Sequence, residues 1–440
     1  MIHAEIMRSA RRAEVLADYS AAVQANRRKF LQGDDTATAE YIYDNQIKDA
    51  EAIVREFKDH NRRVISITKK TKVGMDGLMI EIATRMTTDP DDAFTAQNVL
   101  IITGMSNAAW QRDMKAKAPN CFKDQIFHHG QLKNAALRNL RNGLIMIDEI
   151  DTGNKEFQVL HTTLRDAGLL DVAHMEQNNN RFIFVSATMI KELHDLADWS
   201  QTPNLCARFQ MTVPANYIGH GDFLERGILQ EFYPMDTDEA ADQWIREDIL
   251  ANYDQDFRIH IARVNKTSAR TLNDACRRNH VAFYNHTSDD RLGEGAIKAL
   301  FNQQLTGHVV IGIKGFFRRA NLIPNKWKLR IGATHERCTK VIDNSVQIQG
   351  LPGRMSGYWR DVIEGGHRTG PHRTSLRAVK EYEEAYADPF GDNSYRCAGF
   401  TKKQGVVTTA HPTMLAARNI AGLQTLAHNM KTLDLDPIQD

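Results

Sequence analysis

Two adjacent carboxylates, Asp148 and Glu149, follow an apolar run at 144–147. If that run is a strand of an open parallel sheet, both side chains lie at its carboxyl end, where such sheets bind ligands. The first carboxylate could hold Mg²⁺, directly or through water, and the second could polarise an attacking water. The pattern favours metal-dependent phosphate chemistry, although Asp and Glu also follow strands as ordinary turn or helix-cap residues.

Two hydroxyl side chains, Ser186 and Thr188, stand at the end of a second apolar run, 182–185. At the tip of a strand they could hydrogen-bond a neighbouring carboxylate and sense its occupancy. They could equally cap a helix expected at 190–199, because Ser and Thr side chains accept hydrogen bonds from the first free amides of a helix. The residues alone leave both interpretations open.

Short β-branched runs that alternate with helical periodicity predict the elements that would position these residues. A first series of strands is expected at 64–67, 99–102, 125–127, 144–147 and 182–185. A second series is expected at 258–262, 281–284, 309–313 and 328–331, with 346–348 as a further candidate. Such alternation indicates parallel sheets with crossover helices. The predicted fold class is therefore α/β, with two tandem units at 45–212 and 257–365.

Three other segments complete the predicted organisation. Residues 1–44 form a helical N-terminal extension that carries Arg8, Arg11, Arg12, Arg27, Arg28 and Lys29. Residues 213–256 are expected to form an acidic linker, because 222–256 contains eleven Asp or Glu and two Arg. Residues 366–440 form a C-terminal extension with helices expected at 375–386 and 413–430.

Composition excludes several classes of protein. The chain has 440 residues, of which 42% are hydrophobic and 25% charged, so a globular protein is expected and global disorder is not. No apolar run approaches the roughly 18 residues that span a bilayer, and the N-terminus lacks the apolar stretch of a signal peptide. The five cysteines are scattered, which predicts reduced thiols and an intracellular location.

Charge is unevenly distributed, although 56 basic residues nearly balance 55 acidic ones. Residues 311–377 contain thirteen Lys or Arg and four Asp or Glu, a net charge of +9, against −9 for 222–256. A basic segment of this kind favours contact with a polyanion such as nucleic acid. The two segments could also be solvated faces that offset each other.

Taken together, the Asp148-Glu149 and Ser186-Ala187-Thr188 strand ends resemble motifs II and III of superfamily 2 helicases and translocases. The order of the remaining motifs is similar over about 45–360. The matching segments are Asn45-Gln46-Ile47 for an adenine-contacting glutamine, 64–77 for motif I, 99–113 for motif Ia and its flank, 258–265 for motif IV, 312–324 for a loose motif V and 349–354 for motif VI. The Gly353-Arg354 and Gly357-Tyr358 ending is more similar to viral or phage members than to cellular ones.

The phosphate loop departs from the family pattern. Where the family has Gly-Lys-Ser/Thr, this chain has Gly74-Met75-Asp76, so the lysine that neutralises the phosphates and the hydroxyl that holds Mg²⁺ are both missing. An upstream lysine could fold back over the phosphates, and the candidates are Lys69, Lys70 and Lys72. Without such compensation the loop would no longer hold ATP well, and the sequence does not decide between the two outcomes.

The resemblance implies two RecA-like domains that bind ATP and Mg²⁺ between them and act as an ATP-driven helicase or translocase on DNA or RNA. Asp148 would hold Mg²⁺, and Glu149 would activate the attacking water. Arg354, the only arginine of a motif that commonly has two, would reach the γ-phosphate, and Ser186 and Thr188 would couple nucleotide state to closure. The other implied contacts are Gln46, Lys72, Gly74, Met75, Asp76 and Gln349 for the nucleotide, and Lys314, Arg318 and Arg319 for nucleic acid.

A second hypothesis belongs to a different class. The chain could keep the fold but not the turnover, as a hydrolysis-deficient nucleic-acid-binding or structural subunit, and the substituted phosphate loop supports this alternative. In either case it could work within a larger replication, transcription or packaging complex.

Overall fold

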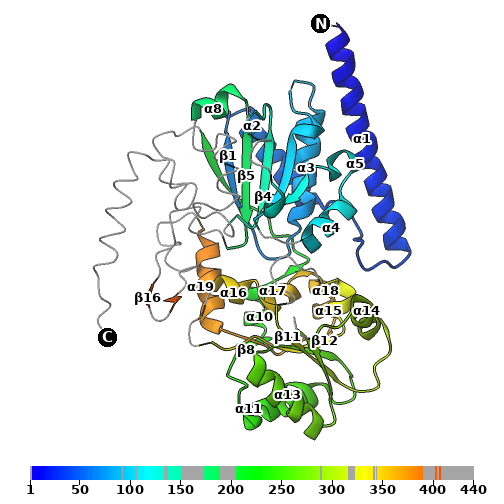
Figure 1. Cartoon of the computed structure of the whole chain (residues 1–440), viewed down its shortest axis with the longest axis vertical. Helices are drawn as coiled ribbons and strands as arrows, with labels where there is room; N and C mark the ends of the chain where they lie inside the picture. Colours follow the sequence, from blue (N-terminus) through cyan, green and yellow to red (C-terminus); the bar gives the residue numbers. More distant parts are fainter. Residues whose placement is uncertain are drawn as a thin grey trace.

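Two parallel six-stranded sheets form the centres of the two units, which lie one above the other in Figure 1. The computed structural model describes residues 2–91, 93–104, 108–132, 137, 139–150, 164, 172–188, 205–287, 290–315, 323–339, 342, 344–389, 402–403 and 406–407. The two sheets and their covering helices confirm the predicted α/β class with tandem RecA-like units.

The sheet of the first unit has the strand order β3-β2-β4-β5-β1-β6. Its strands are β1 (Val64–Thr68), β2 (Val99–Thr103), β3 (Ile126–His128), β4 (Leu144–Asp148), β5 (Arg181–Ser186) and β6 (Cys206–Gln210). Thr68 pairs with Ser186 across β1 and β5, and Asp148 pairs with Val185 across β4 and β5. Because all these strands are parallel, the three chain segments that come after β1, β4 and β5 leave the sheet at one edge.

Helices cover both faces of the first sheet. Within β1, Ile65 and Ile67 pack on one face and Val64 on the other, and all five residues of the strand are buried. A parallel strand buried on both faces is apolar without alternation, which is why these strands stand out in the sequence. The helices of this unit are α2 (Asp44–Lys58), α3 (Met75–Thr88), α4 (Ala108–Lys117), α5 (Asn120–Lys123) and α8 (Val172–Gln177), with short 3₁₀ turns at Ala96–Asn98 and His129–Gln131.

The sheet of the second unit has the strand order β10-β11-β9-β12-β14-β8. Its strands are β8 (Leu229–Glu231), β9 (Ile259–Arg263), β10 (Ala282–His286), β11 (Val309–Ile313), β12 (Ile331–His335) and β14 (His372–Thr374). Its helices are α10 (His220–Glu225), α11 (Asp238–Gln243), the π-helix Trp244–Leu250, α12 (Ala251–Tyr253), α13 (Lys266–Arg278), α14 (Glu294–Asn302), α15 (Asn325–Lys328), α16 (Asn344–Ile348), α17 (Leu351–Met355), α18 (Arg360–Glu364) and α19 (Leu376–Ala387). Two short antiparallel pairs, β7 (Tyr217–Ile218) with β13 (Gly357–Tyr358) and β15 (Lys402–Lys403) with β16 (Val406–Val407), lie outside the two sheets.

The acidic stretch predicted as a linker, 213–256, is instead part of the second unit. Its strand β8 forms one edge of the second sheet, and Trp244 and Ile249 are fully buried in the core beside Val264. The second unit also extends past residue 365, because β14 and α19 of the expected C-terminal extension belong to it. The prediction of a linker rested on acidic composition, whereas the apolar side chains of the same stretch determine where it packs.

Two strand predictions in the second unit were displaced. Residues 325–328 form the short helix α15, and the strand expected at 328–331 begins at Ile331. The candidate strand at 346–348 is the end of helix α16. The expected helices at 190–199 and 413–430 lie outside the described residues.

The N-terminal extension is a single 30-residue helix, α1 (Ile2–Leu31), which runs along one side of the first unit in Figure 1. It is held by contacts from its middle: Val15 is buried, and Tyr19 Oη donates a hydrogen bond to Glu81 Oε2 on α3 (2.9 Å). No helix in the described part of the chain is both long enough and apolar enough to cross a membrane.

Candidate functional site in the cleft between the two units

A cavity of about 650 Å³ lies between the two units, at the carboxyl ends of β1 and β4. Its wall in the first unit includes Lys69, Lys72, Asp148 and Glu149, and its wall in the second unit includes Gln349, Arg354 and Tyr358. A volume of this size is typical of small-molecule and cofactor sites. The cavity thus gathers most of the residues that the sequence singled out.

The loop between β1 and α3 lines the floor of this cavity. Lys72 and Gly74 both have positive φ, 60° and 93°, so the backbone turns sharply where α3 begins. Positive φ is uncommon for a side-chain-bearing residue such as Lys72, and turns that alternate this way present successive amides to anions. The loop therefore has a backbone that alternates as in anion-binding turns, although it lacks the sequence Gly-Lys-Ser/Thr.

Gln46 holds this loop in place from α2. Its Nε2 donates a hydrogen bond to the carbonyl oxygen of Gly74 (2.5 Å), and its Oε1 accepts one from the amide of Tyr43 (2.8 Å). A Cβ atom at Gly77 would lie 2.7 Å from Gln46 Oε1, and one at Gly74 would be closer still to Nε2. A side chain at either glycine would therefore displace the Gln46 side chain from its contact with the loop. The adenine contact that the resemblance implies for Gln46 stays a prediction.

The three lysines of the loop have different surroundings. Lys69 Nζ forms an ion pair with Asp148 Oδ1 (2.9 Å), and Asp148 and Glu149 raise the pKa of Lys69 although burial opposes them. Lys70 Nζ lies 2.5 Å from Glu383 Oε2 on α19 and 4.0 Å from the ring centroid of Tyr386. Lys70 is therefore tied to the second unit and does not line the cavity.

Lys72 is the third lysine of the loop and lines the cavity. Burial, together with the charges of Arg354 and Lys69, lowers its pKa well below the ordinary value, although Asp76 and Glu149 act in the opposite direction. Its ammonium forms no ion pair or hydrogen bond with any other described residue. Three cations thus converge on the cavity at a place where an anion would relieve their repulsion.

Met75 and Asp76 do not take over the roles of the residues that they replace. Met75 is 4% exposed and packs in the hydrophobic core of the first unit. Asp76 lies in the first turn of α3, with Oδ2 3.4 Å from Lys117 Nζ. A carboxylate there is compatible with phosphate only if a cation lies between the two groups.

Asp148 and Glu149 are both 5% exposed at the end of β4. The amide of Glu149 donates a hydrogen bond to Asp148 Oδ1 (3.0 Å), and Glu149 itself has φ 56°. A non-glycine residue in this conformation carries strain of order 1–3 kcal/mol, which persists where the surroundings fix it and is typical of functional sites. Burial raises the pKa of Asp148, and the ion pair with Lys69 opposes that rise.

Asp148 fits the expected magnesium role in one respect. Oδ1 is engaged by Lys69 and the Glu149 amide, whereas Oδ2 has no hydrogen-bond partner among the described residues. Mg²⁺ in phosphate-transfer sites takes one or two carboxylates and completes its shell with substrate phosphates and water. No group of three or more His, Cys, Asp or Glu within the described residues is arranged to hold a metal.

Gln349 connects Glu149 of the first unit to the second unit. Its Nε2 donates hydrogen bonds to Glu149 Oε2 (2.8 Å) and to Thr188 Oγ1 (3.2 Å). The amide of Thr188 in turn donates to Ser186 Oγ (3.1 Å). Thr188 therefore shares a hydrogen-bond donor of the second unit with Glu149, and Ser186 is linked to it through the Thr188 amide; the coupling role stays a prediction.

Arg354 and Tyr358 are the other residues that the second unit brings to the cavity. Arg354 is 1% exposed on α17, and its charge contributes to the lowered pKa of both Lys72 and Lys328. Tyr358 Oη donates a hydrogen bond to the carbonyl oxygen of Val73 in the loop (2.6 Å). Its ring stacks on that of Tyr43, with centroids 4.7 Å apart.

Tyr358 and Tyr43 were not predicted as site residues. Tyr358 was noted in the Gly357-Tyr358 ending and, with Gly357, as one of two residues at the place of the family's second arginine; in the structure it joins the loop after β1 to the second unit. The signal that could have identified Tyr358 is an aromatic residue near a motif position where the family has a charged one. Tyr43 carries no comparable signal, because its partner lies 315 residues away.

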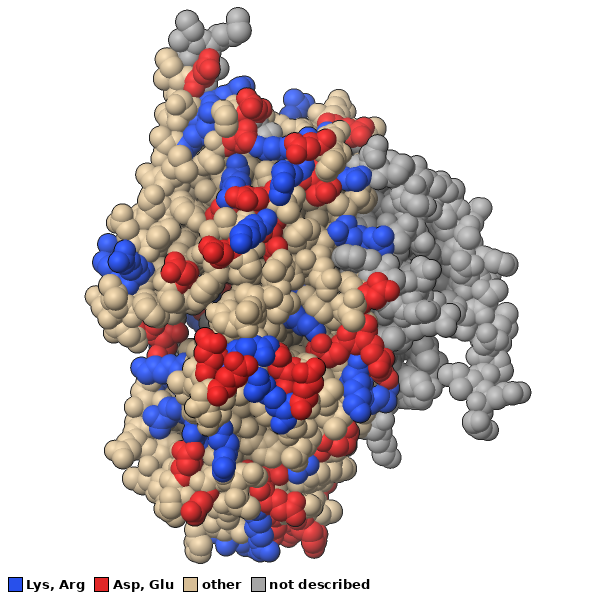
Figure 2. All heavy atoms as spheres, turned by 180° about the vertical axis from the view of Figure 1, so that it is seen from behind, with Lys and Arg blue, Asp and Glu red and all other residues tan. Residues whose placement is uncertain are grey.

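The expected nucleic-acid contacts at Lys314, Arg318 and Arg319 stay predictions. Lys314 follows β11 and is exposed, while Arg318 and Arg319 lie outside the described residues. Within the basic segment, Arg360 pairs with Asp222 and Arg373 pairs with Asp248, both in the acidic segment. These pairs favour the interpretation in which the two segments offset each other. Figure 2 shows basic and acidic side chains interspersed over the face of the molecule that it views.

No protein-family model matches the chain, and no curated protein matches it. Among solved structures, it is similar to S. cerevisiae Dbp5 bound to RNA and ADP BeF3, with 12% identity, coverage of 78% of this chain and 88% of that chain, and a TM-score of 0.43. It is also similar to the NS3-like helicase from Alongshan virus (11% identity, 72% and 74% coverage, TM-score 0.41) and to the Escherichia coli DEAH/RHA helicase HrpB (10%, 76% and 43%, 0.45). Identities and TM-scores this low do not assign the chain to a family, so its function has to be inferred from the side chains of the cleft.

Proposed function

We propose that this protein is a nucleic-acid helicase or translocase that hydrolyses ATP in the cleft between its two RecA-like units. The observation that carries the proposal is the meeting of both units at Glu149. Gln349 of the second unit is hydrogen-bonded to this carboxylate, and Arg354 of the second unit lines the same cavity as Lys69 and Lys72 of the first. Residues from two units around one carboxylate make the chemistry dependent on how the units are arranged.

The triphosphate would lie among Lys69, Lys72 and Arg354. An anion there offsets the repulsion that these cations exert on one another, so binding energy is available from groups already in place. Mg²⁺, held by Asp148 together with the phosphates, would neutralise charge that develops as the terminal phosphate is transferred. Lys72 would supply the charge that the family's loop lysine supplies, from the other side of Gly74.

Glu149 would orient the attacking water and take up its proton. The strained backbone of Glu149 and its hydrogen bond from Gln349 hold the carboxylate in one orientation, which general-base catalysis requires. Arg354, from the second unit, would stabilise the charge on the terminal phosphate. Arginines in this position contribute about 10³–10⁵ in rate where they operate.

Hydrolysis would be coupled to movement through Gln349. Because its amide bridges Glu149 and Thr188, a change in the charge or position of the phosphates alters a contact that spans the cleft. Opening and closing of the two units would then change how each one holds a DNA or RNA strand.

The experiment that tests this function is phosphate release from Mg-ATP, measured at low salt with no nucleic acid, single-stranded DNA, duplex DNA or RNA. The matched variant is Glu149→Gln, which keeps a hydrogen-bonding side chain of the same size but cannot take up the proton. We expect turnover that rises with at least one nucleic acid and falls by at least about 10³-fold in the variant, with nucleotide affinity within about threefold of wild type. Absence of turnover with every nucleic acid, together with retained nucleic-acid binding, would favour the hydrolysis-deficient subunit instead.

A further inference from the structure

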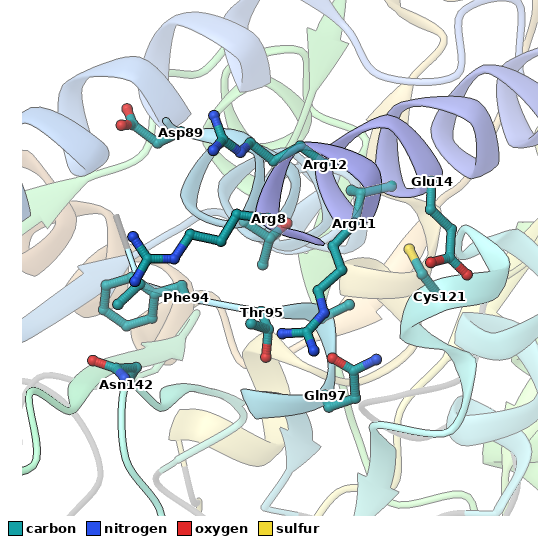
Figure 3. Close-up of a pocket in the computed structure, with 14 residues that line it drawn as sticks. Arg8, Arg11, Arg12, Glu14, Asp89, Phe94, Thr95, Gln97, Cys121 and Asn142 are labelled. Atoms are coloured by element: carbon teal, nitrogen blue, oxygen red, sulfur yellow. The ribbon is translucent and has the colours of Figure 1, made fainter. Parts of the chain in front are cut away.

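A second cavity, of about 300 Å³, lies between α1 and the segment that leads into β2. Three arginines of α1 line it, Arg8, Arg11 and Arg12. Figure 3 shows Arg8 and Arg11 extending from α1 to the two sides of Thr95, with Gln97 below Arg11. The spacing of i, i+3 and i+4 places all three side chains on one face of the helix.

The charges of these guanidinium groups are not offset by an ion pair within the described part of the chain. None of the three forms an ion pair or hydrogen bond with any other residue that the structure describes. Of the two carboxylates in the lining, Asp89 is paired with Lys58, and Glu14 lies on the far side of Arg11, beside Cys121, in Figure 3. The neutral donors and acceptors of the pocket, which include Thr95, Gln97 and Asn142, complete a surface suited to an anion with several oxygens.

This cavity is distant from the cleft. Helix α3 begins at the cleft with Met75, and Thr87 near its other end lines the arginine pocket. Fourteen residues of α-helix correspond to about 20 Å, so the two cavities lie at opposite ends of the first unit. A ligand at the arginines therefore does not belong to the nucleotide site.

We propose that the arginine pocket binds the phosphodiester backbone of a single nucleic-acid strand, as a contact separate from the cleft. Two guanidinium groups about one helical turn apart, roughly 5 Å along the axis, suit neighbouring phosphates better than one compact ion. Arginine forks recognise phosphate through paired N–H donors without reading a base, which suits a sequence-independent contact. The site goes beyond the proposed function, since nothing in the cleft requires it.

The test compares two double variants of the full-length protein. Arg8→Ala/Arg11→Ala removes the pocket's fork, and Arg27→Ala/Arg28→Ala removes the same charge from an exposed part of the same helix outside both cavities. Affinity for a fluorescent 20-nucleotide single strand, as DNA and as RNA, is measured by anisotropy over a series of salt concentrations without nucleotide. Melting temperature and ATP hydrolysis without nucleic acid show whether each variant remains folded.

We expect the pocket variant to bind the strand about tenfold more weakly and to lower the slope of log affinity against log salt by about 1.4, since each phosphate contact on a single strand contributes roughly 0.7. The matched variant should change affinity less than about twofold. Equal losses in both variants, or no loss in either, would overturn the proposal. The proposal is also overturned, in favour of a small anion, if inorganic phosphate or tripolyphosphate raises the melting temperature of the protein through this pocket while the pocket variant binds the strand as tightly as wild type.

The two proposals fail separately. If wild type hydrolyses no ATP under any condition but the pocket variant loses strand affinity as expected, the motor function is wrong and the arginine site remains. If ATP hydrolysis is stimulated by nucleic acid but strand affinity is unaffected by the pocket variant, the arginine site is wrong and the motor function remains.

Discussion

Replacement of Lys72 should have opposite effects on nucleotide binding and on the stability of the nucleotide-free protein. Lys72 faces a cavity in which burial, Arg354 and Lys69 all disfavour its charge. With a triphosphate in place the same charge becomes favourable. An ammonium about 4 Å from a phosphate charge gains roughly 4 kcal/mol at the effective dielectric of a protein surface, before desolvation is subtracted.

For Lys72→Met we therefore expect about 2–3 kcal/mol weaker binding of Mg-ATP, or roughly 30- to 150-fold. The nucleotide-free variant should be more stable by about 1 kcal/mol, because a partly buried charge next to two like charges is replaced by an apolar side chain of similar length. Nucleotide affinity is measured by titration with a fluorescent ATP analogue, and stability by thermal unfolding with and without Mg-ATP.

The matched control is Lys70→Met, in the same loop. Lys70 is paired with Glu383, so its removal should lower stability while nucleotide affinity changes less than about threefold. The reasoning is refuted if Lys72→Met binds Mg-ATP as tightly as wild type, or if it destabilises the nucleotide-free protein as the control does.

Two further predictions concern residues that line the same cavity from the second unit. Gln349→Leu removes two hydrogen bonds across the cleft, one of them to a carboxylate. Turnover stimulated by nucleic acid should therefore fall about 10- to 100-fold, while nucleotide affinity stays within about threefold of wild type. Unchanged stimulation would argue against a coupling role. Burial, with the charge of Arg354, lowers the pKa of Lys328 to about 7, whereas its pKa in the unfolded chain is near 10.5. Between these two pH values the unfolded chain therefore binds more protons than the folded one. From pH 7 to pH 9 the unfolding free energy of wild type should therefore rise by about 2 kcal/mol more than that of Lys328→Met. Urea unfolding measures both proteins over this range, and equal pH dependence in the two would contradict the prediction.

The sequence was most informative about the parallel strands and the polar residues at their carboxyl ends. Buried parallel strands are continuous apolar runs, so β1, β4 and β5 could be located, and with them the positions of Asp148 and Ser186. The edge strand β6 was missed because it is only partly buried and polar residues, Arg208 and Gln210, interrupt its apolar ones.

The misassigned linker shows why composition alone is insufficient. In that stretch Ala241, Trp244, Ile245 and Ile249 are buried, and their spacing of i, i+3, i+4 and i+8 is that of an apolar helix face, a signal that the acidic composition obscured. Acidic side chains on its exposed positions dominate the composition, whereas a few apolar side chains attach the segment to the second sheet.

The contacts that define the candidate site depend on tertiary placement. Glu149 and Gln349 are separated by 200 residues, and Tyr358 reaches a carbonyl in the loop of the other unit. No local pattern encodes such pairs. The choice among the three lysines likewise required the structure, because only their surroundings distinguish Lys72 from Lys69 and Lys70.

The central claim, that ATP is hydrolysed only when both units contribute, is tested most directly at Arg354. Phosphate release and Mg-ATP affinity are measured for wild type, Arg354→Ala and Arg354→Lys, with melting temperature as the check on folding. We expect turnover to fall about 10³-fold or more in the alanine variant while affinity changes less than about tenfold, with only partial recovery in the lysine variant because it lacks the planar fork. Undiminished turnover in folded Arg354→Ala would show that the second unit is not part of the catalytic site.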